Sequence, residues 1–198
     1  MNVLSLAANP GQSLGDENIS KLVGDALPIE DYRGQKILLI VPDHTRTAPV
    51  GLLFKNIHRQ IGEATAALDV MIALGTHPPM DEEAICKRLE ISPEERREEY
   101  AKVKFHNHEW NNPNALREIG VIPASDIAEL SGGRFEMELP VTINRRLFDY
   151  DQIIIVGPVF PHEVVGFSGG NKYLFPGVSG PELLNFFHWL GAVISNPK

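Results

Sequence analysis

The segment KILLIVPDHTR at residues 36–46 decides how this 198-residue chain is expected to fold. Its opening KILLIV is a continuous apolar run of strand length, which is typical of a strand buried on both faces of a sheet. Apolar residues then recur with i, i+3, i+4, i+7 spacing between Pro49 and Gly62, which predicts a helix directly after the strand. A buried strand followed by a helix is half of a parallel crossover unit.

Similar patterns occur on both sides of that segment. Further strands are predicted at 68–74, 103–105, 136–143 and 152–156, and helices at 18–27, 81–90, 93–102, around Leu116 and from about Pro181. The strand at 136–143 is expected to be antiparallel or at an edge, because Pro140 interrupts it. We therefore expect one Rossmann-like α/β domain over residues 1–198, with a mostly parallel sheet, helices on both faces and a site at the C-terminal edge of the strands.

The composition indicates an ordinary globular domain that acts on small molecules. Hydrophobic residues make up 43% of the chain and charged residues 22%, which is enough apolar material for a core. The formal charge of −8 argues against binding to nucleic acid or to an anionic membrane surface, since both require a basic face. A single cysteine, no signal-peptide pattern and no apolar run of about 20 residues predict a cytoplasmic protein.

Histidines follow four of the predicted strands. The exits read PDHTR at 42–46, GTHP at 75–78, HNHE at 106–109 and PHE at 161–163, and they contain five of the seven histidines. One such histidine could simply hydrogen-bond within its loop, but all exits of a parallel sheet lie on one edge, so four together favour a shared site. Neutral imidazole is the commonest transition-metal ligand and also suits acid/base chemistry near neutral pH.

A glycine-rich loop follows the last of these exits. Gly166-Phe167-Ser168-Gly169-Gly170 could present backbone N–H groups to a phosphate. The loop also has the Gly-x-Ser-x-Gly form of a hydrolase nucleophile elbow, which requires a strand running directly into the serine and a helix directly after it. Residues 161–166 and Pro176 interrupt that arrangement, so a hydrolase is disfavoured.

Three motifs resemble the N-terminal domain of the nickel-dependent lactate racemase family. They are PDHTR at 42–46, GTH-P-M at 75–80 and PHEVVGFSGGNKYLFPGV at 161–178, and the resemblance extends from about Lys36 to His188. It implies an isomerase with a nickel-pincer nucleotide, a pyridinium mononucleotide whose two sulfurs and ring carbon hold nickel. Lys172 would form the covalent link to this cofactor, and His188 would be the protein's nickel ligand.

The same resemblance assigns the remaining site residues. His77 and His162 would be the paired acid/base residues, and Arg46 would hold the substrate carboxylate, for which a guanidinium is well suited. Asp43 and Thr45 would position the cofactor, and the loop residues Ser168, Gly169 and Gly170 would contact it. A racemase requires two bases, because either enantiomer must lose its hydroxyl proton while its Cα hydride passes to the cofactor.

Three of these assignments also have a purely structural alternative. Lys172 could be a surface lysine, although its apolar neighbours favour a lowered pKa and a nucleophilic amine. His188 could be a core histidine on an apolar helix face. Arg46 could form a structural ion pair with Asp43.

Two departures from the family pattern qualify the expectation. The chain has Pro78 where the family has arginine, so a basic group beside His77 is missing. Family members are about twice as long and carry a C-terminal domain that closes over the substrate. We therefore expect a truncated N-terminal domain with an open site and reduced activity, and with an exposed face that favours homodimer formation.

The sequence thus predicts a racemase or epimerase of a short, lactate-like 2-hydroxy acid. One alternative is a non-catalytic fragment or paralogue that binds a nucleotide-like ligand. Another is a metal-assisted hydrolase with His77, His162 and His188 as direct ligands. The residues do not select the side chain of the 2-hydroxy acid, and they assign no role to His44, His106 or His108.

Overall fold

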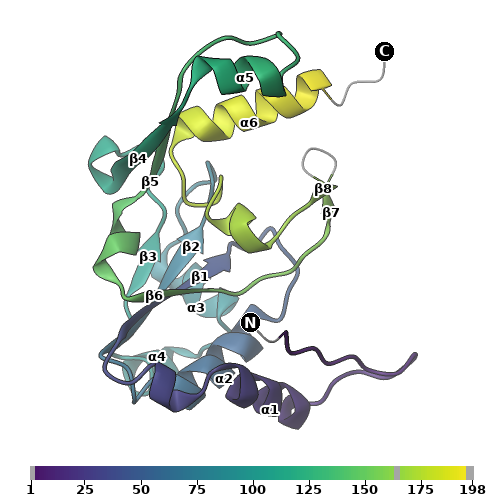
Figure 1. Cartoon of the computed structure of the whole chain (residues 1–198). Helices are drawn as coiled ribbons and strands as arrows, with labels where there is room; N and C mark the ends of the chain where they lie inside the picture. The colour runs from purple at the N-terminus through teal and green to yellow at the C-terminus, as the bar shows by residue number, and fades with distance from the viewer. Residues whose placement is uncertain (1–2, 163–165, 195–198) are drawn as a thin grey trace.

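The computed structural model describes residues 3–162 and 166–194 of the chain. The helices and strands follow one another as shown in Figure 1. In order they are α1 (Asp16–Ala26), η1 (Ile29–Asp31), β1 (Lys36–Pro42), α2 (Val50–Ile61), β2 (Ala67–Ala73), α3 (Glu82–Arg88), α4 (Pro93–Arg97), β3 (Phe105–Asn107), η2 (Pro113–Ala115), β4 (Leu116–Ile122), α5 (Ala124–Leu130), β5 (Leu139–Asn144), η3 (Arg145–Asp149), β6 (Gln152–Ile155), β7 (Pro161–His162), β8 (Gly166–Phe167), η4 (Gly170–Tyr173) and α6 (Pro181–Ile194).

The central sheet has four parallel strands in the order β3-β2-β1-β6. β1 is a middle strand and pairs with β2 over its whole length, from Lys36 opposite Ala67 to Pro42 opposite Ala73. Its residues from Ile37 onward are buried, as the apolar run predicted. Because all four strands run the same way, their C-terminal ends lie on one edge of the sheet, and the predicted α/β fold is confirmed.

The two faces of the sheet are covered differently. Ile37, Leu39 and Val41 pack on one face in a core with the buried residues of α1, α2 and α3. Leu38 and Ile40 point to the opposite face, as alternation along a strand requires, and that face is covered largely by the 3-10 helices η3 and η4. Both faces of the sheet are therefore covered. On the second face the cover is made of short 3-10 helices, and one of them, η4, also contributes residues at the C-terminal ends of the strands.

A smaller layer lies beyond the C-terminal edge of the sheet. β4 and β5 form an antiparallel pair, and α5 and α6 pack with it around Ile127, Leu139 and Phe186. Figure 1 shows α5 and α6 stacked together on the side of the sheet opposite α1 and α2. In the part of the chain that the structure describes, no helix is both long and apolar enough to cross a membrane.

Three local predictions were wrong. The third strand covers 105–107 rather than 103–105, so His106 lies within β3 instead of beyond it. The segment around Leu116 forms strand β4 rather than a helix, because it pairs with β5, a contact that local sequence does not encode. The charged helix ends at Arg97 rather than at Lys102, although the whole segment 93–102 is solvated as expected except for the buried Tyr100.

Candidate active site

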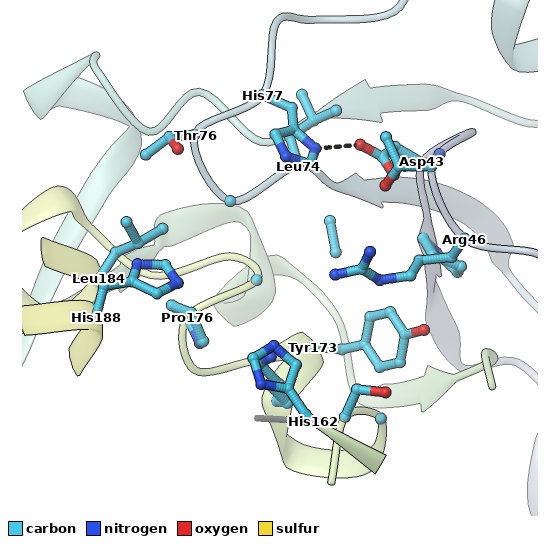
Figure 2. Close-up of a pocket in the computed structure, with 18 residues that line it drawn as sticks. Asp43, Arg46, Leu74, Thr76, His77, His162, Tyr173, Pro176, Leu184 and His188 are labelled. Atoms are coloured by element: carbon cyan, nitrogen blue, oxygen red, sulfur yellow. Dashed lines mark hydrogen bonds and ion pairs between the residues drawn. The ribbon is translucent and has the colours of Figure 1, made fainter. Parts of the chain in front are cut away.

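A pocket opens at the C-terminal edge of the sheet, between the ends of β1 and β2 and the segments η4 and α6. Figure 2 shows the side chains of His77, His162, His188 and Arg46 around it, with His77 and His162 on opposite sides. The predicted site residues in its wall are Asp43, Thr45, Arg46, His77, His162, Ser168, Gly169, Lys172 and His188. The structure thus brings together all of the predicted residues except Gly170, which lies next to the lining at the start of η4.

His77 is hydrogen-bonded to Asp43 from the neighbouring strand end. Its Nδ1 lies 2.5 Å from Asp43 Oδ2, and the Asp43 carboxylate also accepts bonds from the amide and hydroxyl of Thr45 at 3.0 and 2.6 Å. Burial by itself would raise the pKa of Asp43, but the bonds from Thr45 and His77 outweigh it and lower that pKa below its usual value. The Asp43 carboxylate can accept a hydrogen bond from Nδ1–H of His77, and in that tautomer Nε2 carries no proton and can act as a base.

Arg46 extends into the pocket from the loop after β1. The side chain of Arg46 forms no ion pair among the described residues, so the expected alternative of a pair with Asp43 is not observed. The backbone of this loop is held by Arg88 at the end of α3, which donates to the carbonyls of Pro42 at 3.2 Å and Arg46 at 2.8 Å. The backbone of Arg46 is therefore held in place by Arg88, and the Arg46 guanidinium can donate hydrogen bonds to a carboxylate in the pocket.

His162 lies on β7, which pairs antiparallel with β8. Ser168 extends this pairing, because its hydroxyl accepts from the amide of Phe160 at 3.1 Å and its amide donates to the Phe160 carbonyl at 2.8 Å. Ser168 follows β8 rather than a strand of the central sheet. Its hydroxyl is bonded to the backbone of Phe160, two residues before His162, and the geometry is not that of a nucleophile elbow.

Lys172 is presented by the 3-10 helix η4, whose entry depends on Gly169. The φ angle of Gly169 is +90°, and a Cβ there would lie 2.6 Å from the Pro158 carbonyl oxygen, so no side chain fits. The Lys172 amide donates to the Gly169 carbonyl at 3.0 Å, and the Lys172 carbonyl accepts from Gly177 at 3.1 Å. This tight turn places the half-buried Lys172 in the pocket wall.

Tyr173 also lines the pocket, beside Arg46 in Figure 2. Burial raises the pKa of Tyr173, and the nearby Arg46 opposes this shift. The ring packs directly on Gly157, where a Cβ would lie only 2.1 Å from the tyrosine hydroxyl. Sequence analysis missed this residue, because Tyr173 sits in an apolar run and carries no motif of its own.

Helix α6 delivers His188 to the pocket. Leu184 and His188 are four residues apart, so both lie on the helix face that lines the pocket. Phe186 and Leu190 lie on another face and pack into the core shared with α5 and β5. His188 is exposed rather than a core residue, which excludes that alternative for it.

The remaining histidines of the strand exits do not reach the pocket. His44 is exposed and His106 contacts the Tyr150 hydroxyl at 3.3 Å. His108 is 2% exposed and its Nε2 lies 2.8 Å from the Ser179 carbonyl oxygen. The expectation that all four strand ends contribute histidines to one site is therefore wrong for β3. Its two histidines form hydrogen bonds within the fold instead.

Comparison with known proteins decides the family. A model of the lactate racemase N-terminal domain matches residues 16–198, which is most of the chain. The chain belongs to the lactate racemase N-terminal domain family. This membership confirms the resemblance of the three motifs to the N-terminal domain of lactate racemases.

Curated lactate racemases align with much of the chain. The chain is 26% identical over 167 residues to the lactate racemase of Thermoanaerobacterium thermosaccharolyticum, and 24% identical over 195 residues to that of Lactiplantibacillus plantarum. The alignments cover 82% and 94% of this chain, but only 34% and 40% of the two racemases. The chain therefore spans well under half the length of these relatives.

Solved structures show the same fold. A crystal structure of a Thermotoga maritima protein superposes with a TM-score of 0.82 at 37% identity, covering 93% of this chain and 43% of that one. The lactate racemase apoprotein from Thermoanaerobacterium thermosaccharolyticum superposes with a TM-score of 0.60 at 25% identity, covering 85% and 38%. The α/β architecture of this lactate racemase family domain is thus shared with a named racemase.

Proposed function

We propose that this chain forms the cofactor-binding face of a racemase or epimerase that acts on a short, lactate-like 2-hydroxy acid. The observation that carries the proposal is the shared pocket. His77, His162, Arg46, Lys172 and His188 come from five separate segments, yet all five line it. An amine, a carboxylate-binding guanidinium and three imidazoles in one cleft match the needs of a proton-coupled hydride transfer.

The chain's residues fit a nickel-pincer nucleotide, linked covalently at Lys172 and with its metal held by His188. Among residues 3–162 and 166–194, no three His, Cys, Asp or Glu side chains are grouped so that they could hold a metal ion. A metal at His188 must therefore take its remaining donors from a bound group, as the sulfur and carbon donors of this nucleotide would allow. The glycine turn before Lys172 leaves backbone exposed beside the pocket for the nucleotide's polar groups.

When bound, the nucleotide supplies the hydride acceptor, and the protein's residues handle the proton and the carboxylate. Because Asp43 holds Nδ1–H of His77, the free Nε2 can take the hydroxyl proton of one enantiomer. His162, on the opposite side of the pocket, can take it from the other enantiomer. Loss of this proton and of the Cα hydride leaves a 2-oxo acid. The histidine on the other side then returns a proton to the carbonyl oxygen of that acid, so the two histidines exchange the roles of base and acid in the two directions.

Arg46 orients the substrate between these two bases. Its guanidinium can donate two parallel hydrogen bonds to the carboxylate, which fixes both the position and the tilt of Cα. Arg88 holds the carbonyl of Arg46 and so limits movement of this grip. The family pattern that the motifs resemble has arginine beside the first histidine, where this chain has Pro78, so Arg46 would be the main carboxylate-binding group here.

The metal-assisted hydrolase is not supported by the geometry. His77 is committed to Asp43, and no metal-binding group of three side chains occurs among the described residues. The non-catalytic binding module is the second candidate, because the chain corresponds to only 34–43% of the length of the relatives it was compared with. A whole racemase of this kind would contain a C-terminal domain as well, and association of two copies of this chain stays a prediction.

The first test is the covalent link. We expect the chain, co-expressed with the enzymes that make the nucleotide, to gain the mass of the cofactor by intact-mass spectrometry. Lys172→Ala is expected to abolish the adduct, because no other amine lies at the turn, whereas the exposed Lys102→Ala serves as the matched control and keeps it. An unmodified wild-type chain would contradict the proposal.

The second test separates the enzyme from the binding module. The loaded chain is supplied with one enantiomer of lactate or malate, and chiral chromatography follows the appearance of the other. Formation of the opposite enantiomer supports the racemase, and its loss in His162→Ala assigns that side chain to the reaction. A complete adduct without any turnover would favour the binding module.

A further inference from the structure

Four residues, Gly177 to Gly180, connect the two ends of the proposed cofactor site. This 177–180 linker begins after η4, which carries Lys172, and ends at α6, which carries His188. The position of the linker therefore sets the position of α6 relative to η4. Any group bound to both Lys172 and His188 depends on that spacing.

The backbone of the linker is hydrogen-bonded to two other parts of the fold. The Gly75 amide donates to the Gly177 carbonyl at 2.9 Å, which ties the linker to the turn that carries His77. The Asn144 amide donates to the Val178 carbonyl at 2.8 Å, and the Gly180 amide donates to the Thr142 carbonyl at 3.0 Å. The linker is thus held between the exit of β2 and the end of β5.

The side chain of His108 completes this attachment at Ser179. His108 Nε2 lies 2.8 Å from the Ser179 carbonyl oxygen, and its Nδ1 lies 3.1 Å from the side-chain nitrogen of Asn144. All three residues are at most 2% exposed, so water cannot replace these bonds. A buried carbonyl or amide left without its partner is costly, which makes the arrangement sensitive to the loss of the imidazole.

Neighbouring bonds determine which His108 nitrogen carries the proton. The Asn144 side-chain oxygen accepts from the Arg146 amide at 3.1 Å, so its NH₂ group faces His108. Nδ1 of His108 therefore accepts a hydrogen bond, and Nε2–H donates to Ser179. The neutral imidazole bridges β5 and the linker with one donor and one acceptor.

We propose that His108 is a positioning residue of the cofactor site, which fixes the spacing between Lys172 and His188 by holding the 177–180 linker. The inference rests on the proposed function. The covalent link needs the Lys172 amine alone, whereas nickel retention also needs His188 at the correct place. Loss of His108 should therefore weaken nickel retention without preventing the adduct.

The experiment compares three variants of the 198-residue chain. His108→Phe keeps the ring volume but removes both hydrogen bonds, and His108→Gln restores an N–H that can reach the Ser179 carbonyl. His106→Phe is the matched control, because it removes an imidazole only two residues earlier, within β3, whose hydrogen-bond partner is Tyr150 rather than the linker. If His108→Phe does not fold, His108→Asn replaces it, since its amide is too short to reach Ser179.

Two readouts are taken, one with the cofactor and one without. After co-expression with the cofactor-making enzymes, adduct is measured by intact mass and nickel per adduct by metal analysis during dialysis against a chelator. We expect the adduct to form in all variants, with nickel lost roughly tenfold faster from His108→Phe and at the wild-type rate from His108→Gln and His106→Phe. In unloaded protein, hydrogen exchange of the amides at 177–182 should be faster in His108→Phe alone.

The outcomes distinguish this inference from the proposed function. A wild-type chain without adduct overturns both. A wild-type adduct together with unchanged nickel loss in His108→Phe, or unchanged exchange at 177–182, overturns the positioning role and leaves the function intact. Equal acceleration in His106→Phe would also overturn it, because the effect would then be general loosening of the fold.

Discussion

His77 and His108 follow neighbouring strands of the same parallel sheet, yet they have opposite surroundings. The side chain of His77 is 50% exposed and lies in the pocket with Asp43, whereas His108 is 2% exposed and bonded to Ser179 and Asn144. The difference follows from the strand order β3-β2-β1-β6. The exit of β2 is central and open, whereas β3 is an edge strand whose exit is covered by β5 and the 177–180 linker.

The comparison shows that a strand exit places a residue at the correct edge of a sheet but does not decide its role. That role depends on what covers the edge. A histidine at an open strand end can exchange protons with a ligand. A histidine covered by the 177–180 linker can only form hydrogen bonds with neighbouring residues of the fold. Mutation of His77 should therefore lower turnover, whereas mutation of His108 should lower the stability of the fold.

The largest effect is expected for His77→Ala. Loss of a general base should lower turnover of the loaded protein by about 10²–10⁴-fold, without preventing the adduct at Lys172 and with little change in the melting temperature. Chiral chromatography, intact mass and thermal unfolding measure the three quantities. Turnover that survives in His77→Ala would remove this residue from the mechanism.

Asp43→Asn should have the next largest effect. The amide cannot hold Nδ1–H of His77 as a carboxylate does, so the tautomer and orientation of the base are lost, and turnover should fall about 10–100-fold. The matched control is Asp69→Asn, which alters a similarly buried aspartate that accepts from the Tyr150 hydroxyl and the Lys104 amide, both outside the pocket wall. Equal loss of turnover in both variants would mean that burial, not the contact with His77, is responsible.

His108→Phe should act on stability, and the effect should depend on pH. Burial lowers the pKa of His108 from its usual 6.5, with the Ser179 carbonyl and Glu109 opposing the shift. The unfolded state then binds a proton that the folded state does not, so the stability from His108 is complete above about pH 6.5 and is lost as the pH falls through the folded pKa. Well above that value we expect the variant to lose about 1–3 kcal/mol of unfolding free energy.

Denaturant unfolding of wild type and His108→Phe at several pH values tests this sign. The difference between the two proteins should shrink as the pH is lowered below about 6.5. Burial also lowers the pKa of His58 and His106, but both are present in the variant, so the difference isolates His108. A difference that grows at acidic pH would contradict the proposed tautomer.

The smallest effect is expected for His44→Ala. This histidine follows β1 even more closely than His77 follows β2, but it is exposed and outside the pocket wall. Stability should change by less than about 0.5 kcal/mol, and neither adduct formation nor turnover should change. A clear loss of turnover would show that the exit of β1 contributes more than Asp43, Thr45 and Arg46.

The strands and the site could largely be predicted from sequence because their signals are local. Continuous apolar runs locate β1 and β2, and the motifs at their ends locate Arg46 and His77. The pairing of Asp43 with His77 was missed although a signal existed, since an acid and a histidine at adjacent strand exits are expected to meet. Neither family membership nor the position of His108 after a strand could predict its structural role, because its hydrogen-bond partners lie 36 and 71 residues away along the chain.

Other features depend on contacts that no local pattern encodes. β4 has mostly exposed residues and exists through its pairing with β5, so its sequence gives no clear alternation. Tyr173 reads as part of an apolar run and becomes a pocket residue only because η4 turns it toward β1. In both cases tertiary pairing, rather than propensity, decides the outcome.

The absence of a side chain at Gly157 has a consequence for the size of the pocket. The phenol of Tyr173 occupies the space that even a single methyl group at this position would need. Any larger residue would force the ring to move, and Figure 2 shows that the ring borders the space beside Arg46. A single carbon atom added at residue 157 would thus change the shape of the pocket beside Arg46 without changing any of its polar groups.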